Sequence, residues 1–121
     1  MTRRLAVCVV ERNLFVAADI AEMLRMALPE ADLAVFHELG AARTASVAPP
    51  DVLMIAANAQ GTFDMSPEDA AWISSSEVIA FDAADRSAFP GWLHLSKPFA
   101  EEDLTEAVLG LIAGRSEERM G

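Results

Sequence analysis

Charged side chains follow three of the five predicted strands of this sequence, each at the point where an apolar run ends. Glu11 and Arg12 follow the first strand, Asp82 follows the fourth, and Lys97 follows the fifth. Parallel strands of an open α/β sheet end at one edge, where such folds place their ligand sites, so these side chains should converge. Two acids and two bases there could bind a ligand or a phosphate group. They could also pair with one another and close the site.

The central strand of the sequence ends without a reactive group. Four large apolar residues, 52–55, follow the break at Pro50 and Asp51 and lead directly into Ala56 and Ala57. A short apolar run between turn signals is typical of a strand that is buried on both faces of a sheet. Neither alanine supplies an acid, a nucleophile or a metal ligand at this strand end.

The histidines and the late aromatic residues are weaker candidates for function. His37 and His94 lie on different predicted strands, and no cysteine or second histidine stands at ligand spacing, which argues against a metal site. Trp92 opens the last strand at the edge side of the sheet, next to a short connection. We therefore expect Trp92, Phe89 and His94 to be the residues that could form an interface.

The composition indicates one globular domain with an acidic surface. The 121 residues are 53% hydrophobic, and 19 acids against 9 bases give a net charge of −10 at pH 7. Such a surface repels phosphate backbones, so we expect no nucleic acid partner. The apolar segment after Arg3 and Arg4 is too short for a signal peptide or a membrane span, which predicts a cytoplasmic protein. We expect a single domain over 1–121, with its core over 4–114 and a charged tail over 115–121.

Strands and helices alternate along the sequence. The predicted strands are Leu5–Val10, Leu33–Phe36, Val52–Ile55, Glu77–Phe81 and Trp92–Ser96, and the predicted helices cover 14–28, 38–48, 66–74 and 101–114. Residues 82–91 have room for one helical turn at most, so a fourth helix is shortened or missing. This alternation predicts right-handed βαβ units and a flavodoxin-like α/β/α sandwich, with a five-stranded parallel sheet in the order 2-1-3-4-5.

Three stretches of the sequence together resemble the receiver domain of two-component response regulators, the CheY-like domains of bacterial signal transduction. They are Val9–Leu14, Pro50–Ile55 and Leu95–Phe99, and the resemblance covers roughly residues 4–114. The most specific element is Lys97-Pro98-Phe99. In that family an acidic pair and a phosphoacceptor aspartate bind Mg²⁺, while a hydroxyl residue and a lysine contact the phosphoryl group. Aspartyl phosphate formation needs this set, because it requires a carboxylate nucleophile and a hard cation.

The resemblance implies a degenerate site in this chain. Two of the family's positions are kept and three are changed: the second acid is an arginine, the hydroxyl residue is an aspartate, and the phosphoacceptor is an alanine. A methyl group cannot accept a phosphoryl group, and a guanidinium in the metal site repels Mg²⁺. The mapped positions are Glu11, Arg12, Ala56 (or Ala57 if the register slips by one), Asp82 and Lys97.

We therefore expect a stand-alone pseudo-receiver without catalytic activity and with lost or weak Mg²⁺ binding. It would regulate through contacts with a histidine kinase or another signalling protein, or as a homodimer. The alternative is a receiver that is still switched by phosphate or a small ligand at the altered pocket. An ordinary flavodoxin-like enzyme ranks behind both, because the sequence has no glycine-rich phosphate loop and no nucleophile–base pair at the strand ends. We also expect Lys97 to contact Glu11 or Asp82.

Overall fold

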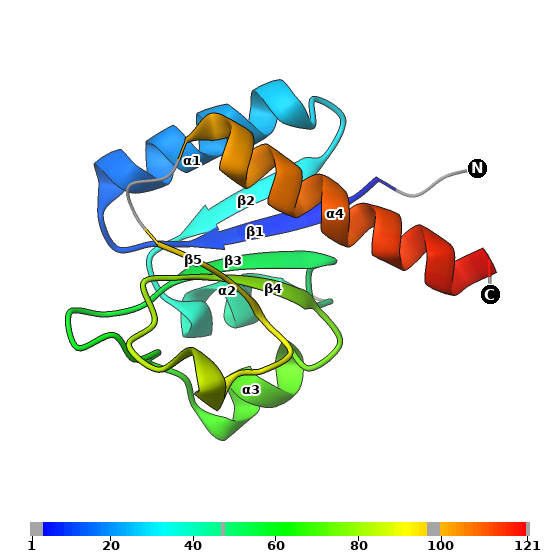
Figure 1. The fold of residues 1–121 in the computed structure, drawn as a ribbon. Helices are drawn as coiled ribbons and strands as arrows, with labels where there is room; N and C mark the ends of the chain where they lie inside the picture. Colours follow the sequence, from blue (N-terminus) through cyan, green and yellow to red (C-terminus); the bar gives the residue numbers. More distant parts are fainter. Residues whose placement is uncertain (1–3, 47, 97–99, 121) are drawn as a thin grey trace.

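The protein forms one parallel five-stranded sheet with helices on both faces (Figure 1). The computed structural model describes residues 4–46, 48–96 and 100–120, except for the side chains of 101, 112 and 114–120. The strand order is β2-β1-β3-β4-β5, as predicted from the sequence. The strands are β1 Ala6–Val10, β2 Asp32–Phe36, β3 Val52–Ala56, β4 Glu77–Phe81 and β5 Leu93–Leu95.

Helices α1 and α4 cover one face of the sheet, and α2 and α3 cover the other (Figure 1). Between β4 and β5 the chain forms only the short 3₁₀ helix η1, which confirms the prediction of a shortened or missing helix at this point. The helices are α1 Leu14–Ala27, α2 Leu39–Ala45, α3 Pro67–Trp72, η1 Arg86–Ala88 and α4 Glu101–Met120.

The three inner strands are buried on both faces, which explains their unbroken apolar sequences. Alternate residues of β3 point to opposite layers: Val52 and Met54 pack with α1 and α4, and Leu53 and Ile55 pack with α2 and the end of α3. Val52, Leu53 and Met54 have no exposed surface. Cys8 of β1 is also buried, and burial raises the pKa of its thiol to about 12, so it packs as a small apolar residue.

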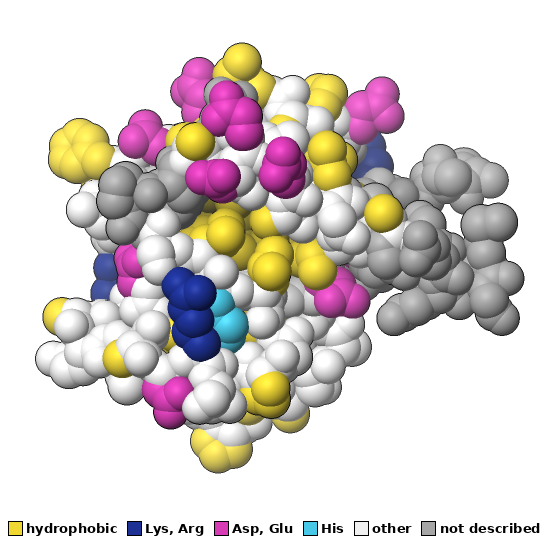
Figure 2. Space-filling view, viewed as in Figure 1, with side chains coloured by type: hydrophobic (Ala, Val, Ile, Leu, Met, Phe, Trp, Pro, Cys, Tyr) yellow, Lys and Arg dark blue, Asp and Glu magenta, His cyan; other side chains and the backbone are white. Residues whose placement is uncertain are grey.

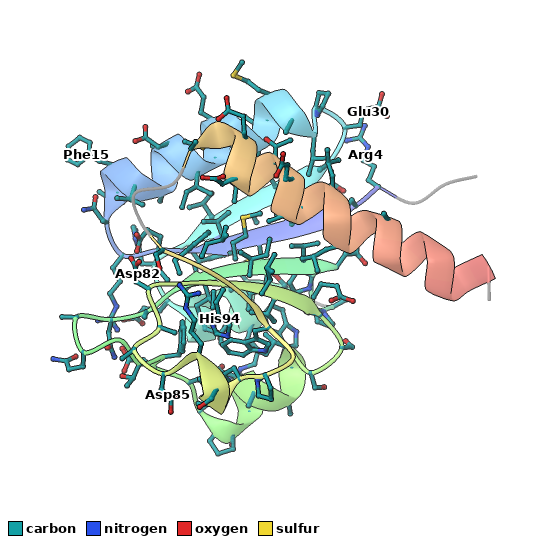
Figure 3. The ribbon with its side chains drawn as sticks, in the orientation of Figure 1. Arg4, Phe15, Glu30, Asp82, Asp85 and His94 are labelled. Atoms are coloured by element: carbon teal, nitrogen blue, oxygen red, sulfur yellow. The ribbon has the colours of Figure 1, made fainter. Side chains whose placement is uncertain are left out.

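Helix α1 buries a different set of residues from the one that its apolar spacing predicts, which is Leu14, Ala18, Ala21, Leu24 and Leu28. Its N-cap is Asn13, a residue type that is favoured at that position, and the buried residues are Ala17, Ile20, Ala21 and Leu24. Leu14 and Ala18, which the apolar spacing placed on the buried face, are exposed. The helix begins beyond the ends of the strands, where Phe15 points away from the sheet (Figures 1 and 3).

Helix α4 is longer than the sequence indicated. We expected it to end near Gly114 and to leave a charged tail, but the helix continues to Met120. A glycine inside a helix costs only about 1 kcal/mol relative to alanine. The residues after it include two glutamates and two arginines, which favour helix, so the glycine does not end α4.

The loop between β3 and α3 is held in one conformation by the side chain of Asn58. Its Oδ1 accepts hydrogen bonds from the backbone N–H groups of Gln60 (3.0 Å) and Thr62 (3.1 Å). Gly61 has a φ of +77°, and its carbonyl accepts from Ala84 N–H at 2.9 Å. A Cβ at Gly61 would lie 2.5 Å from Ala84 Cβ, so only glycine fits this contact. The loop is thereby fixed against the connection that follows β4.

An ion pair joins helices α2 and α3. Arg43 Nε donates to Asp69 Oδ1 at 2.7 Å, and the Asp69 side chain is only 8% exposed. Asp69 also forms a capping box with Ser66 at the start of α3. Burial raises the pKa of Asp69, but the hydrogen bonds from Arg43 and Ser66 outweigh burial and lower that pKa below its usual value.

Replacement of Arg43 by methionine should destabilise the protein at neutral pH by about 1.5–3 kcal/mol, the usual range for a hydrogen bond to a charged group. The pKa of Asp69 is lower in the folded protein than in the unfolded chain. The pair therefore stabilises the fold above about pH 4, and this contribution is lost as the pH falls through the folded-state pKa.

Urea unfolding at pH 7 and pH 3 measures both effects, and the loss caused by Arg43→Met should shrink at pH 3. Arg25→Met, at an exposed position of α1, serves as the matched control. Equal losses from the two substitutions at pH 7 would show that the Arg43–Asp69 pair does not stabilise the fold.

Candidate functional site

A pocket of about 260 Å³ lies at the edge where the parallel strands end. Its wall is formed by the ends of β1 and β3, the start of α2, and the loop after β3. Four of the residues that we singled out from the sequence line it together: Glu11, Arg12, Ala56 and Ala57. The topology accounts for this, because β1 and β3 are neighbours and Val10 pairs with Ile55, so the residues after these partners emerge side by side.

Glu11 lies deep in this pocket and Arg12 lies at its surface. Glu11 is 7% exposed, and its backbone N–H donates to Phe36 O at 3.0 Å, which continues the pairing of β1 with β2 by one residue. Arg12 follows with an exposed side chain. Alternation along the extended chain therefore directs the two neighbouring charges to different parts of the site.

Arg12 forms an ion pair with an acid that was not among the predicted site residues. Its Nη2 lies 2.7 Å from Asp64 Oδ2, and about 60% of each side chain is exposed. We had expected the bases of the site to face Glu11 and Asp82. Asp64 Oδ1 also accepts from Asn58 Nδ2 at 3.3 Å, so the β3–α3 loop holds the carboxylate in place. Asn58 and Gly61 predict a turn in this loop, but they do not predict in which direction the Asp64 side chain points.

The floor of the pocket beside this ion pair carries methyl groups. Ala56 pairs with Phe81 in the sheet, and Ala57 N–H donates to Phe81 O at 2.9 Å, so the end of β3 stays aligned with β4. Both alanines line the pocket. Two further acids, Glu38 and Asp69, stand on the side of α2 and α3, together with His37.

Asp82 lies at the same edge of the sheet but outside this pocket. It follows β4 directly, and Figure 3 shows it where the strands end. Its φ is +61°, in the left-handed region that aspartate adopts more readily than most residues, and its N–H donates to Leu95 O at 3.0 Å. Asp82 is not among the described residues that line the pocket. The expected contact of Lys97 with Glu11 or Asp82 lies outside the described residues.

The aromatic residues near η1 pack against one another. Phe89 and Trp92 are stacked with their ring centroids 4.1 Å apart, and Phe63 meets both rings edge-on at 5.4 Å. His94 Nε2 lies 3.1 Å from Phe89 O. This cluster packs on the face of the sheet that also carries α3. It lies next to η1, the only helix that the described residues form between β4 and β5. The residues that we expected at an interface are therefore half-buried in the fold, and an interface role for them is still a prediction.

Within the described part of the chain, no three His, Cys, Asp or Glu side chains are grouped as metal ligands. Nor does any described helix have the length and apolar character needed to cross a membrane.

No family model and no curated protein matches this sequence. Solved structures do match it. A CheY-like response regulator receiver domain protein from Methanospirillum hungatei JF-1 superposes with a TM-score of 0.75 at 12% identity, over 96% of this chain and 99% of that one. The response regulatory domain of mrkE from Klebsiella pneumoniae gives a TM-score of 0.72 at 13% identity, over 93% and 99%. The BeF3-activated DrrB receiver domain gives 0.70 at 15% identity, over 92% and 99%.

These neighbours match nearly the whole length of the chain, at identities that establish the fold alone. The protein has the flavodoxin-like, CheY-like fold of response regulator receiver domains.

Proposed function

We propose that this protein is a pseudo-receiver, which regulates a signalling partner through protein–protein contacts without phosphorylation of its own strand-edge site. The observation that carries the proposal is the composition of the pocket. Ala56 and Ala57 occupy the end of β3, and the Arg12–Asp64 ion pair lies beside them. The fold supplies the scaffold of a receiver domain, and the pocket has no carboxylate at the strand end where the chemistry would begin.

Two acids at the pocket are poor substitutes for the missing nucleophile. Asp64 is bound to Arg12 through one oxygen and to Asn58 through the other. Asp69 is bound in the same way, to Arg43 and to the Ser66 N–H. A carboxylate attacks a phosphoryl group through an oxygen that is free to approach it. Each of these acids would have to break a charge-assisted hydrogen bond first.

Arg12 argues against a functional Mg²⁺ site. A guanidinium is charged at every physiological pH, and it stands at the position where the resemblance implies the second metal-binding acid. Magnesium requires several oxygen ligands in octahedral geometry. A fixed positive charge beside Glu11 repels the ion, and the pairing of Arg12 with Asp64 occupies a further oxygen.

The alternative function is a receiver that still responds to phosphate or a small ligand at this pocket. It is favoured by the pocket's volume of about 260 Å³, which the Arg12–Asp64 pair leaves open. His37 and Glu38 on the α2 side would contact such a ligand. In either case the net charge of −10 disfavours nucleic acid, so the partner we propose is a protein, such as a histidine kinase or a second copy of this chain. We place this activity in the cytoplasm and assign it to the whole chain as one domain.

Addition of Mg²⁺ with beryllofluoride, which mimics an aspartyl phosphate, separates the two functions. In two-dimensional amide NMR spectra the pseudo-receiver should show no saturable shifts at Glu11, Ala56 or Ala57, because the end of β3 has no carboxylate to bind beryllium. Inorganic phosphate without Mg²⁺ is the control for simple anion binding. Saturable shifts at these three residues would favour the alternative and would end the claim of phosphorylation independence.

Replacement of Arg12 by aspartate should increase the affinity for Mg²⁺ at least about tenfold, since it removes a positive charge and adds an oxygen ligand next to Glu11. The same NMR experiment, with Mg²⁺ alone, measures the dissociation constant. Arg25→Asp is the matched control, because it makes the same change in net charge on the exposed side of α1. If both variants bind Mg²⁺ equally, Arg12 is not what weakens the metal site.

A further inference from the structure

The open edge of the sheet at β5 is a second feature of this protein, separate from the pocket. Strand β5 pairs only with β4, and no strand lies on its other side in the described part of the sheet. The connection before it forms only the short helix η1. An uncovered edge presents backbone groups to which another chain can pair.

A groove of about 580 Å³ runs along this edge, between β5 and α4. Figure 2 shows it as a hollow with an apolar floor, bordered by acidic side chains on one side and by arginine or lysine and histidine on the other. Leu93 and Leu95 line the groove, and Leu93 is 38% exposed. The groove therefore offers apolar contact next to a strand edge.

The backbone of β5 is oriented for pairing on this side. Leu95 O accepts from Asp82 N–H, so the peptide groups of Leu95 face β4. Since successive residues of a strand direct their backbone groups to opposite edges, the N–H and C=O of His94 face the groove. One further strand placed here would pair with His94 and would set its alternate side chains over Leu93.

The charged side chains that line the groove indicate which kind of segment could bind there. Asp103 and Glu106 of α4 are exposed along one wall. The opposite wall carries Arg86, whose Nη2 is held by Ser96 Oγ at 2.6 Å. The acidic wall and the net charge of −10 favour a partner with basic side chains. They disfavour a second copy of this chain, which would bring the same two acids to the same edge.

We propose that the groove binds an extended basic segment of a partner protein, which adds to β5 as a sixth strand. Apolar side chains of this segment lie on Leu93, and lysine or arginine side chains reach Glu106 and Asp103. The inference rests on the proposed function and specifies it: the contact that transmits the signal is a strand added at this edge, and the partner region is extended and basic.

The probe for this site is a capped seven-residue peptide of alternating lysine and valine, titrated into the full chain at low salt. Amide NMR should show saturable shifts at His94, Leu93 and Ser96. The same peptide with every backbone amide N-methylated cannot pair as a strand and should not bind, and nor should a glutamate–valine peptide. Glu106→Gln should weaken binding about two- to fivefold, the effect of one exposed ion pair. Glu102→Gln, also exposed on α4 but outside the groove, should leave binding unchanged.

Equal binding of the N-methylated peptide, or no shifts at β5 with the lysine–valine peptide at millimolar concentration, would overturn the proposal. Shifts at β5 that depend on protein concentration alone, with a dimer in sedimentation, would assign the edge to a second copy and would overturn it as well. The beryllofluoride experiment is independent of these results. Saturable shifts with beryllofluoride would contradict phosphorylation independence but would not change the expected peptide binding. Failure of the peptide to bind would overturn the strand-addition proposal and leave the pseudo-receiver proposal intact.

Discussion

Burial of β1, β3 and β4 on both faces is the constraint on which the rest of this structure depends. Side chains such as Val9 and Met54 have no exposed surface, and each strand alternates between the two helical layers. These strands run parallel under crossover helices, so they all end at one edge. The residues that follow the strands therefore lie together at this edge. The position of the pocket is therefore a consequence of the core, while its chemistry depends on a few residues that the core does not determine.

In the proposed pseudo-receiver, internal pairing takes the place of metal-centred chemistry at this edge. Arg12 brings a permanent cation to the strand edge, and Asp64 neutralises it at 2.7 Å from a loop that Asn58 and Gly61 hold rigid. The pair is exposed, so it adds little to stability. In our account its role is electrostatic: it supplies the positive charge that a metal ion would otherwise supply and uses the oxygen that such an ion would need.

The fold could be predicted from the sequence because it follows from periodicity, and the site could be predicted in part. The strand order and the missing helix were confirmed, and Glu11, Arg12, Ala56 and Ala57 do line one pocket. The partner of Arg12 was missed because Asp64 lies 52 positions away in a loop, where no periodic pattern fixes the direction of a side chain. The predicted end of α4 was wrong, because the free energy cost of one glycine is too small to end a helix among residues that favour helix.

Intact-mass spectrometry after incubation with acetyl phosphate and Mg²⁺ tests the central claim most directly. A chain with alanines at the end of β3, and with Arg12 where the resemblance implies a metal ligand, should gain no phosphoryl group. A receiver domain with a complete site, treated in parallel, should gain one. The account predicts an unchanged mass for this protein. A stoichiometric phosphoryl adduct, lost on treatment with hydroxylamine as an acyl phosphate is, would contradict it and would show that another carboxylate has taken over the reaction.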